Sequence, residues 1–462
     1  MAAMDSSART CGTTLRFFRD SFYRCLNRRA DAFFELTDAL LTAGSVPSPP
    51  HLSLTAVHRR GWGSLYAALS VGCMDEGGLR GLLARHPLGD GDQGGPPIYA
   101  VDVSVWPRCA AEASPERGYY RYHPSRHSAG QPIVAGWAYQ LVAQIGFERD
   151  SWVAPVDVRR VRPAEDTDEV AAEQVRALVE RLPESKDMPI FVFDAGYDPV
   201  KLQRGLEGCP ARILVRLHSN RVFYAAPEEV DPRPVGRPRR HGEKFDLKDP
   251  GSWPEPVCEH RCESDDYGSV RVRCWADLHP KTRRIGERYG CERGPARRAR
   301  HRRRGTVVLV EVSKLPRQTR KPKKLWLWWS GEGEADLDLI WRAYCRRFDL
   351  EHTIRFLKQT LGWTAPRFRH PEQADRWTWL VLAAYAQLRL ARGIVADERL
   401  PWERPQRPRR LTPTRVLRSF APLLATVGTP AKPPKPCGRS PGRPQGSRSG
   451  PAKRHPALKT AA

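Results

Sequence analysis

Residues 189–194 read Pro189-Ile190-Phe191-Val192-Phe193-Asp194, a continuous apolar run that ends in an acid. A second run reads Ile98-Tyr99-Ala100-Val101-Asp102-Val103. Short continuous apolar runs of β-branched and aromatic residues are typical of strands buried on both faces of a sheet, as in α/β proteins. The two runs therefore predict an α/β fold in which two buried strands carry or end in an aspartate, Asp102 and Asp194.

Asp102 and Asp194 need a partner if they are ionised. A carboxylate among apolar side chains is costly unless it is paired or bound to a metal ion. Open α/β sheets also place their ligand sites at strand ends. Taken alone, each aspartate is more simply explained as a turn residue that ends a strand. The two acids predict a site only together with a third element.

That third element is a long helix predicted from Ala335 to Leu361. One face of this helix carries a phenol, an acid and two cations, at steps of three, four and seven residues: Tyr344, Arg347, Glu351 and Lys358. A metal-binding acid beside phosphate-binding cations is what a nuclease requires. The alternative is an ordinary amphipathic helix, in which Glu351 pairs with an arginine four residues away.

The spacing of these four residues resembles the Tyr-Arg-Glu-Lys signature of cut-and-paste insertion-sequence transposases of the DDE superfamily. The resemblance extends over about residues 95–395. It implies a ribonuclease-H-like mixed-sheet core, with a β-rich module inserted between the second aspartate and the glutamate. It further implies that Asp102, Asp194 and Glu351 are catalytic and hold two divalent metal ions, Mg²⁺ or Mn²⁺.

The same resemblance implies roles for other side chains. Tyr344, Arg347 and Lys358 would contact phosphates at the transposon end, and a tryptophan of the insert would stack on a flipped base. Trp253 and Trp275 are both candidates for that tryptophan. The chain is thus predicted to be a DNA transposase that hydrolyses phosphodiesters and transfers strands at the ends of an insertion sequence.

Two other functions remain open at this point. The first is a catalytically inactive DNA-binding or regulatory protein derived from a transposase, and the intact set of three acids argues against it. The second is a structure-specific nuclease or resolvase of the same fold, and the long basic insert argues against that. The expected partner is double-stranded DNA, both transposon ends and target, with no membrane. The resemblance implies a homodimer assembled on DNA.

Composition divides the chain into five predicted parts. Residues 1–95 form a helical domain that could bind DNA, and residues 96–216 form the first part of the catalytic core. Residues 217–323 form the basic, β-rich insert. Residues 324–400 complete the core and add a C-terminal helix. Residues 401–462 form a basic, Pro/Gly-rich tail that we expect to be disordered.

The charge points to a polyanionic partner. The 462 residues carry a formal net charge of +25, with a pI near 10.0. The stretch from Lys281 to Lys324 contains 17 lysines and arginines but only 3 acids. Lysine and arginine that neutralise phosphates release counterions, which favours nucleic acid as the partner. We expect this region to belong to a basic surface continuous with the acidic site. The plainer alternative is a solvated basic surface, as in ribosome-associated proteins.

The cysteines and the hydropathy argue for a reducing, aqueous compartment. Eleven cysteines are scattered without a framework spacing. The nearest approach to a metal cluster is Cys258, His260, Cys262 and Cys274, which lacks paired Cys-x-x-Cys spacing, so we expect no structural zinc there. No apolar run reaches the roughly 18 to 20 residues that span a bilayer, and the start has no signal-peptide core. We expect a cytoplasmic, nucleoid-associated protein.

Overall fold

The computed structural model describes residues 2–44, 46, 48–88, 95–122, 133–148, 150, 152–183, 187–227, 241–281, 304–316, 321–407, 410–436, 442, 444–448 and 450–460. The chain folds into two compact units. Unit 1 comprises Met1–Gln93, Asp102–Val170 and Asp349–Ala462, and unit 2 comprises Gly94–Val101 and Ala171–Phe348. These units differ from the five predicted parts, because the N-terminal helices and the C-terminal segment fold together with part of the predicted core.

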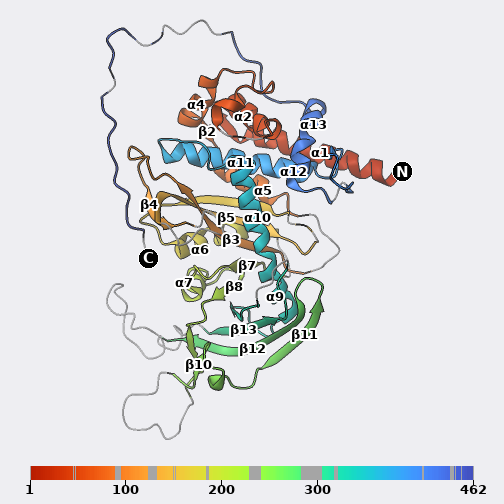
Figure 1. Cartoon of the computed structure of the whole chain (residues 1–462), viewed down its shortest axis with the longest axis vertical. Helices are drawn as coiled ribbons and strands as arrows, with labels where there is room; N and C mark the ends of the chain where they lie inside the picture. The colour runs from red at the N-terminus through yellow and green to blue at the C-terminus, as the bar shows by residue number, and fades with distance from the viewer. Residues whose placement is uncertain are drawn as a thin grey trace. The chain divides into compact units, whose positions relative to one another are not determined.

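The centre of unit 1 is the helix α11 (Pro371–Ala391), which is buried continuously from Trp377 to Leu388. A helix that is apolar on every side is stable only when other elements cover it all round. The elements that contact α11 are α1 (Ala2–Arg24), α2 (Ala30–Thr42), α4 (Trp62–Val71), α12 (Pro413–Arg418) and β6 (Ala154–Val161), and Figure 1 shows the helices among them grouped around it.

A buried ion pair fixes these helices to one another. The guanidinium of Arg19 in α1 donates to both carboxylate oxygens of Asp38 in α2, at 2.7 and 2.9 Å. It also donates to Gln387 Oε1 in α11, at 2.6 Å. Burying two charges is tolerable only when hydrogen bonds offset the loss of water, and here both terminal nitrogens of Arg19 have partners. The remaining helices of unit 1 are α3 (Pro49–Leu52), α5 (Glu76–Ala84), α10 (Phe348–Gln359) and α13 (Phe420–Val427), and β1 (Leu26–Arg28) pairs with β2 (Cys73–Met74).

β5 (Ile133–Ile145) pairs antiparallel with both β4 (Gly118–Arg121) and β6, which contact different stretches of it. It also neighbours β3 (Ile98–Pro107), whose residues from Asp102 onward belong to this unit. Most of the buried residues of β5 and β6 are apolar, with Gln140 and Asp157 as buried polar exceptions.

Parts of residues 401–462, the tail that the sequence analysis expects to be disordered, have secondary structure. Residues 413–427 form α12 and α13. Further on, the Leu458 amide donates to Arg117 O at 2.8 Å, and the Tyr119 amide donates to Leu458 O at 3.2 Å. Leu458 thereby makes a β-bridge to Gly118 at the start of β4. Composition alone suggested disorder, because it cannot show that the edge of a distant strand offers hydrogen bonds to this segment.

Unit 2 is a large mixed sheet with helices, as predicted for an α/β protein. Its strands run in the order β10-β9-β12-β13-β14-β8-β7-β3, with β11 beside β12. The pairs β3–β7 and β7–β8 are parallel and the other pairs are antiparallel. The strands are β7 (Ile190–Phe193), β8 (Arg212–Leu217), β9 (Val222–Tyr224), β10 (Lys244–Asp246), β11 (Cys258–Ser264), β12 (Gly268–Pro280), β13 (Gly305–Val312) and β14 (Leu325–Trp329).

Residues 217–323, the predicted insert, contribute β9 to β13 and are therefore rich in strands. Helices α6 (Thr167–Val179) and α7 (Pro199–Gly205) accompany the parallel strands, and Arg176 of α6 donates to Gly205 O at 2.7 Å. A short 3₁₀ helix, η1, covers Pro250–Ser252. Most of the basic stretch from Lys281 to Lys324 lies outside the described residues.

The predicted single helix from Ala335 to Leu361 is two helices. α9 spans Leu337–Arg346, and α10 begins at Phe348. Arg347 is the turn residue between them, with helical backbone angles of φ −53° and ψ −32°. The predicted spacing is therefore divided between two helices, with Tyr344 in α9, Arg347 in the turn, and Glu351 and Lys358 in α10.

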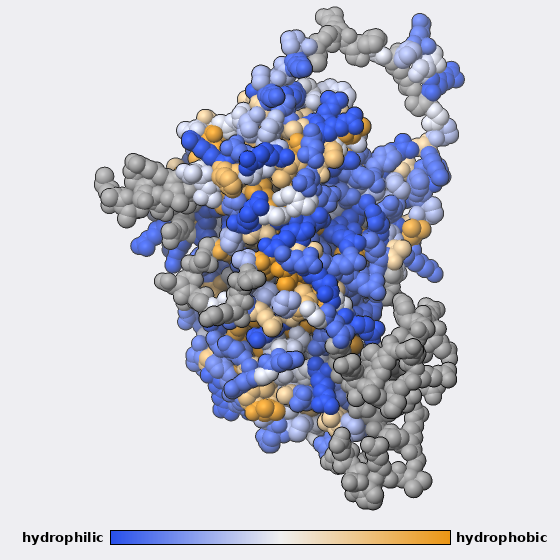
Figure 2. Space-filling model, turned by 180° about the vertical axis from the view of Figure 1, so that it is seen from behind, coloured by the Kyte–Doolittle hydropathy of each residue, from blue (hydrophilic) through white to orange (hydrophobic). Residues whose placement is uncertain are grey.

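Hydrophilic residues cover most of the surface seen in Figure 2, with small hydrophobic areas between them. No helix in the described ranges is long and apolar enough to cross a membrane.

Candidate functional site

The parallel pair β3–β7 sets the register of the two predicted catalytic strands. Within unit 2, Tyr99 lies opposite Phe191 and Ala100 lies opposite Val192. Asp102 follows Ala100 by two residues, and Asp194 follows Val192 by two residues. Asp194 comes directly after the end of β7, as the sequence predicts. Asp102 lies within β3 and belongs to unit 1.

Asp194 also has a local role at the end of its strand. Its Oδ1 atom accepts a hydrogen bond from the Gly196 amide at 2.9 Å. A carboxylate that accepts from the amide two residues on forms an Asx turn, which stops the strand. The turn interpretation of Asp194 is therefore correct, and it is compatible with a second role for the other carboxylate oxygen.

Lys358 attaches α10 to the strand that carries Asp102. Its ammonium donates to Val105 O of β3 at 2.9 Å and lies 5.9 Å from the ring centroid of Trp363. Burial lowers the pKa of Lys358 to about 8, and the negative charge of Asp102 opposes this shift. Glu351 is partly buried two turns earlier on the same helix. The helix that carries Glu351 is therefore fixed beside the strand that carries Asp102.

Tyr344 and Arg347 lie in unit 2, where both side chains are buried. Their exposed fractions are 2% and 3%. The Arg347 guanidinium lies 5.8 Å from the ring centroid of Tyr344 and 5.2 Å from that of Phe348. Burial raises the pKa of Tyr344. The predicted phosphate contacts of these two residues would require the side chains to be uncovered, so their role in DNA binding stays a prediction.

The two candidate base-stacking tryptophans lie in one aromatic cluster. Trp275 is 2% exposed, and its ring centroid is 5.9 Å from that of Trp253 and 5.9 Å from that of Trp326. The Trp253 indole donates to Asp246 O at 2.7 Å, and the Lys324 ammonium lies 4.6 Å from its ring centroid. Both rings are packed against protein, and neither is distinguished as a base-stacking residue.

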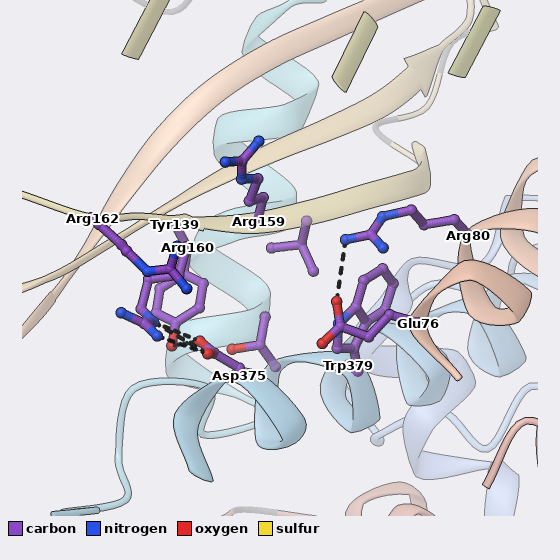
Figure 3. Close-up of a pocket in the computed structure, with 10 residues that line it drawn as sticks. Glu76, Arg80, Tyr139, Arg159, Arg160, Arg162, Asp375 and Trp379 are labelled. Atoms are coloured by element: carbon purple, nitrogen blue, oxygen red, sulfur yellow. Dashed lines mark hydrogen bonds and ion pairs between the residues drawn. The ribbon is translucent and has the colours of Figure 1, made fainter. Parts of the chain in front are cut away.

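An arginine-lined pocket of about 220 Å³ lies in unit 1 (Figure 3). Its arginines are paired with acids of the pocket and its surroundings. Arg80 donates to Asp157 at 2.6 Å, and Arg160 donates to Asp375 at 2.9 Å. The Tyr139 hydroxyl donates to Asp375 at 2.7 Å, and burial raises its pKa well above the usual value. These pairs join β6 to α5 and α11. The arginines of the pocket therefore have a structural role more than an anion-binding role.

A group of possible metal ligands lies elsewhere in unit 2. His260, Cys262 and Asp338 each offer one ligand atom, and these atoms lie within 4.8 Å of one another. The group does not include the three predicted catalytic acids. The sequence analysis considered His260 and Cys262 but missed Asp338, which α9 brings from a distant part of the chain.

The model of the DDE superfamily endonuclease family matches residues 21–281. Because this match covers more than half of the 462 residues, the chain belongs to the DDE superfamily endonucleases. The matched span contains Asp102 and Asp194 and ends before Glu351. It also begins well before residue 95, so helices α2 to α5 fall within the family's span, which the sequence resemblance did not include.

Among solved structures, the chain is similar to a piggyBac transposase synaptic complex with hairpin DNA. The identity is 11%, the match covers 86% of this chain and 71% of that chain, and the TM-score is 0.42. The comparison with curated proteins gave no match.

Proposed function

We propose that this protein is a DNA transposase that cuts and rejoins phosphodiester bonds at the ends of an insertion sequence. Membership of the DDE superfamily endonucleases supports the reaction class. The observation that carries the proposal is the parallel register of β3 and β7, in which Ala100 lies opposite Val192. In the sequence, an acid follows each of these residues at the same interval of two positions.

Asp102, Asp194 and Glu351 are proposed as the catalytic set, on a ribonuclease-H-like core. The attachment of α10 to β3 through Lys358 supports Glu351 as the third member. Three carboxylates offer hard oxygen ligands, which suit Mg²⁺ or Mn²⁺. Two such ions, when bound, supply a nucleophilic hydroxide and neutralise the leaving oxygen. The protein's part is to hold the three carboxylates on two strands and a helix, and thereby to orient the scissile phosphate.

Double-stranded DNA is the proposed partner, bound as a homodimer. The net charge of +25 supports a polyanionic partner, since DNA presents a dense array of phosphates. Proteins of this reaction class must hold two DNA ends together, which a symmetric dimer achieves with one interface.

Glu351→Gln separates catalysis from binding. We expect Mg²⁺-dependent cleavage of duplexes that carry the inverted repeats flanking the gene to fall by at least about 100-fold. Mutation of a residue that supports a metal ligand typically lowers activity about 10- to 100-fold, and loss of the ligand itself should lower it at least as much. DNA affinity should stay near that of the wild type, because the carboxylate makes no favourable contact with phosphate. Cleavage and gel-shift assays measure the two effects.

The matched control is Glu372→Gln, which changes an exposed acid in the first turn of α11. It should leave both cleavage and binding unchanged. Full activity of Glu351→Gln would remove Glu351 from the catalytic set. A wild-type protein that binds the ends but does not cut them with Mg²⁺ or Mn²⁺ would instead favour an inactive DNA-binding derivative of a transposase.

A further inference from the structure

The edge strand β11 presents metal-binding side chains to α9. Its residues alternate between partly buried and exposed, and Cys258, His260 and Cys262 share the partly buried face. α9 contacts both β11 and β12, and Asp338 lies in its first turn. Strand alternation and helix packing thus bring an imidazole, a thiol and a carboxylate together from two segments that are far apart in the sequence.

The spacing of His260 and Asp338 fits two ligands of one metal ion. His260 Nε2 lies 3.5 Å from Asp338 Oδ1. A charge-assisted hydrogen bond would be about 2.7–2.9 Å long. In a tetrahedral site, two donors at about 2.0–2.2 Å from zinc are about 3.3–3.5 Å apart. His260 Nε2 is also buried and makes no hydrogen bond within the part of the chain that the structure describes.

Neighbouring groups hold the Asp338 carboxylate in position. The Trp341 indole donates to Oδ1 at 3.0 Å, and Arg342 donates to Oδ2 at 3.0 Å. Ligating carboxylates in metal sites are commonly held by such outer hydrogen bonds.

We propose that His260, Cys262 and Asp338 bind a divalent ion of the zinc class, with a fourth position open to water. A set of one nitrogen, one sulfur and one oxygen donor suits Zn²⁺, whereas Mg²⁺ takes oxygen ligands. The site is therefore chemically distinct from the three catalytic carboxylates. A bound ion would cross-link the edge strand β11 to α9, the helix that leads toward Glu351.

Cobalt provides a test in the intact chain, because Co²⁺ replaces Zn²⁺ and its thiolate complexes absorb strongly in the near ultraviolet. The reduced, metal-free protein is titrated with Co²⁺ and then with Zn²⁺. We expect thiolate-to-cobalt absorption to saturate at one equivalent and to disappear as Zn²⁺ displaces Co²⁺. Cobalt at the carboxylate site gives no such band, so the result is independent of the proposed transposase activity.

Three variants assign the ligands. Cys262→Ser should abolish the band, and Asp338→Asn should weaken Co²⁺ affinity at least about 10-fold. Cys73→Ser removes an exposed thiol of unit 1 and should leave the titration unchanged. Circular dichroism of each variant confirms that it is folded.

Absence of the band from the wild-type protein would overturn the proposal. A band that survives in Cys262→Ser would also overturn it, since the sulfur would then come from another cysteine. Cys258 and Cys274, which lie directly opposite each other on β11 and β12, are the nearest alternative.

Discussion

Lys358 attaches α10 to β3 and is also a partly buried titratable group. Burial lowers its pKa to about 8, well below the usual 10.5, while its ammonium still donates to Val105 O. The sequence analysis assigned it to phosphate binding, which requires an exposed cation. In the structure its main contact is with β3, so we expect its loss to disturb the position of α10 before it disturbs DNA binding.

Lys358→Met tests this by the pH dependence of stability. The pKa of Lys358 is lower in the folded protein than in the unfolded chain, so between about pH 8 and about 10.5 the unfolded chain binds more protons. Raising the pH through this window should therefore stabilise the wild type relative to Lys358→Met. Below about pH 8 the difference between the two proteins should be constant. Urea unfolding at a series of pH values measures it.

Lys201→Met serves as the control, because Lys201 is exposed on α7. Its stability relative to the wild type should change little across the same window. A constant difference between wild type and Lys358→Met from pH 8 to 10.5 would show that the ammonium is not buried as described.

At the scale of secondary-structure elements, the break at Arg347 divides the predicted motif between two helices. Tyr344 and Arg347 belong to the end of α9 and the turn after it, whereas Glu351 and Lys358 belong to α10. The buried Arg347 side chain packs over Tyr344 and Phe348. It therefore contributes to the packing of the junction between the two helices.

Arg347→Ala should destabilise the protein by about 1–3 kcal/mol, as expected when a buried, packed side chain is truncated. Arg355→Ala, which removes an exposed arginine of α10, should change stability by no more than about 0.5 kcal/mol. Urea unfolding and DNA affinity are measured for both. Wild-type stability with weakened DNA binding in Arg347→Ala would support direct phosphate contact instead.

Strand β5 depends on a glycine where it passes β3. A Cβ atom added to Gly136 would lie 2.3 Å from Trp106 O, and a main-chain oxygen cannot move aside as a flexible side chain can. Gly136→Ala should therefore destabilise the protein by about 1–3 kcal/mol.

Gly63→Ala is the matched change in α4, where an added Cβ meets nothing within 4 Å. Because alanine restricts the unfolded chain, it should stabilise the protein by about 0.4–1 kcal/mol. Thermal unfolding compares the two. Equal effects of both substitutions would contradict the close approach at Gly136.

At the scale of the whole molecule, we expect the excess of positive charge to govern association with the proposed DNA partner. Each phosphate contact made by lysine or arginine adds about 0.9 to the slope of log affinity against log salt concentration. Arg298, Arg300 and Arg302 lie in the most basic stretch of the sequence. Changing all three to glutamate should weaken binding to every DNA sequence and reduce the salt slope by about 0.9 for each phosphate that is no longer neutralised.

A triple change of Arg399, Arg404 and Arg407 to glutamate alters the net charge equally at exposed positions of unit 1. It should reduce the salt slope less than the change in the basic stretch. Fluorescence anisotropy at several salt concentrations distinguishes the two variants. Equal slopes would mean that the total charge matters and that the insert has no special role.

The sequence by itself determined the features that depend on neighbouring residues along the chain. The apolar runs at Ile98 and Ile190 predicted buried strands, because such runs cannot be exposed to water without cost. The positions of Asp102 and Asp194 on or after those strands followed at once. The basic composition predicted a polyanionic partner without reference to the fold.

Only the tertiary structure decided which polar side chains are buried and which distant segments meet. Tyr344 and Arg347 belong to a spacing that suggested an exposed face, yet contacts from elsewhere in the fold cover them. Leu458 is ordered by the edge of β4, and Asp338 joins His260 through the packing of α9. The burial of a side chain, and with it the pKa and the ligands available to it, depends on neighbours that sequence spacing does not reveal.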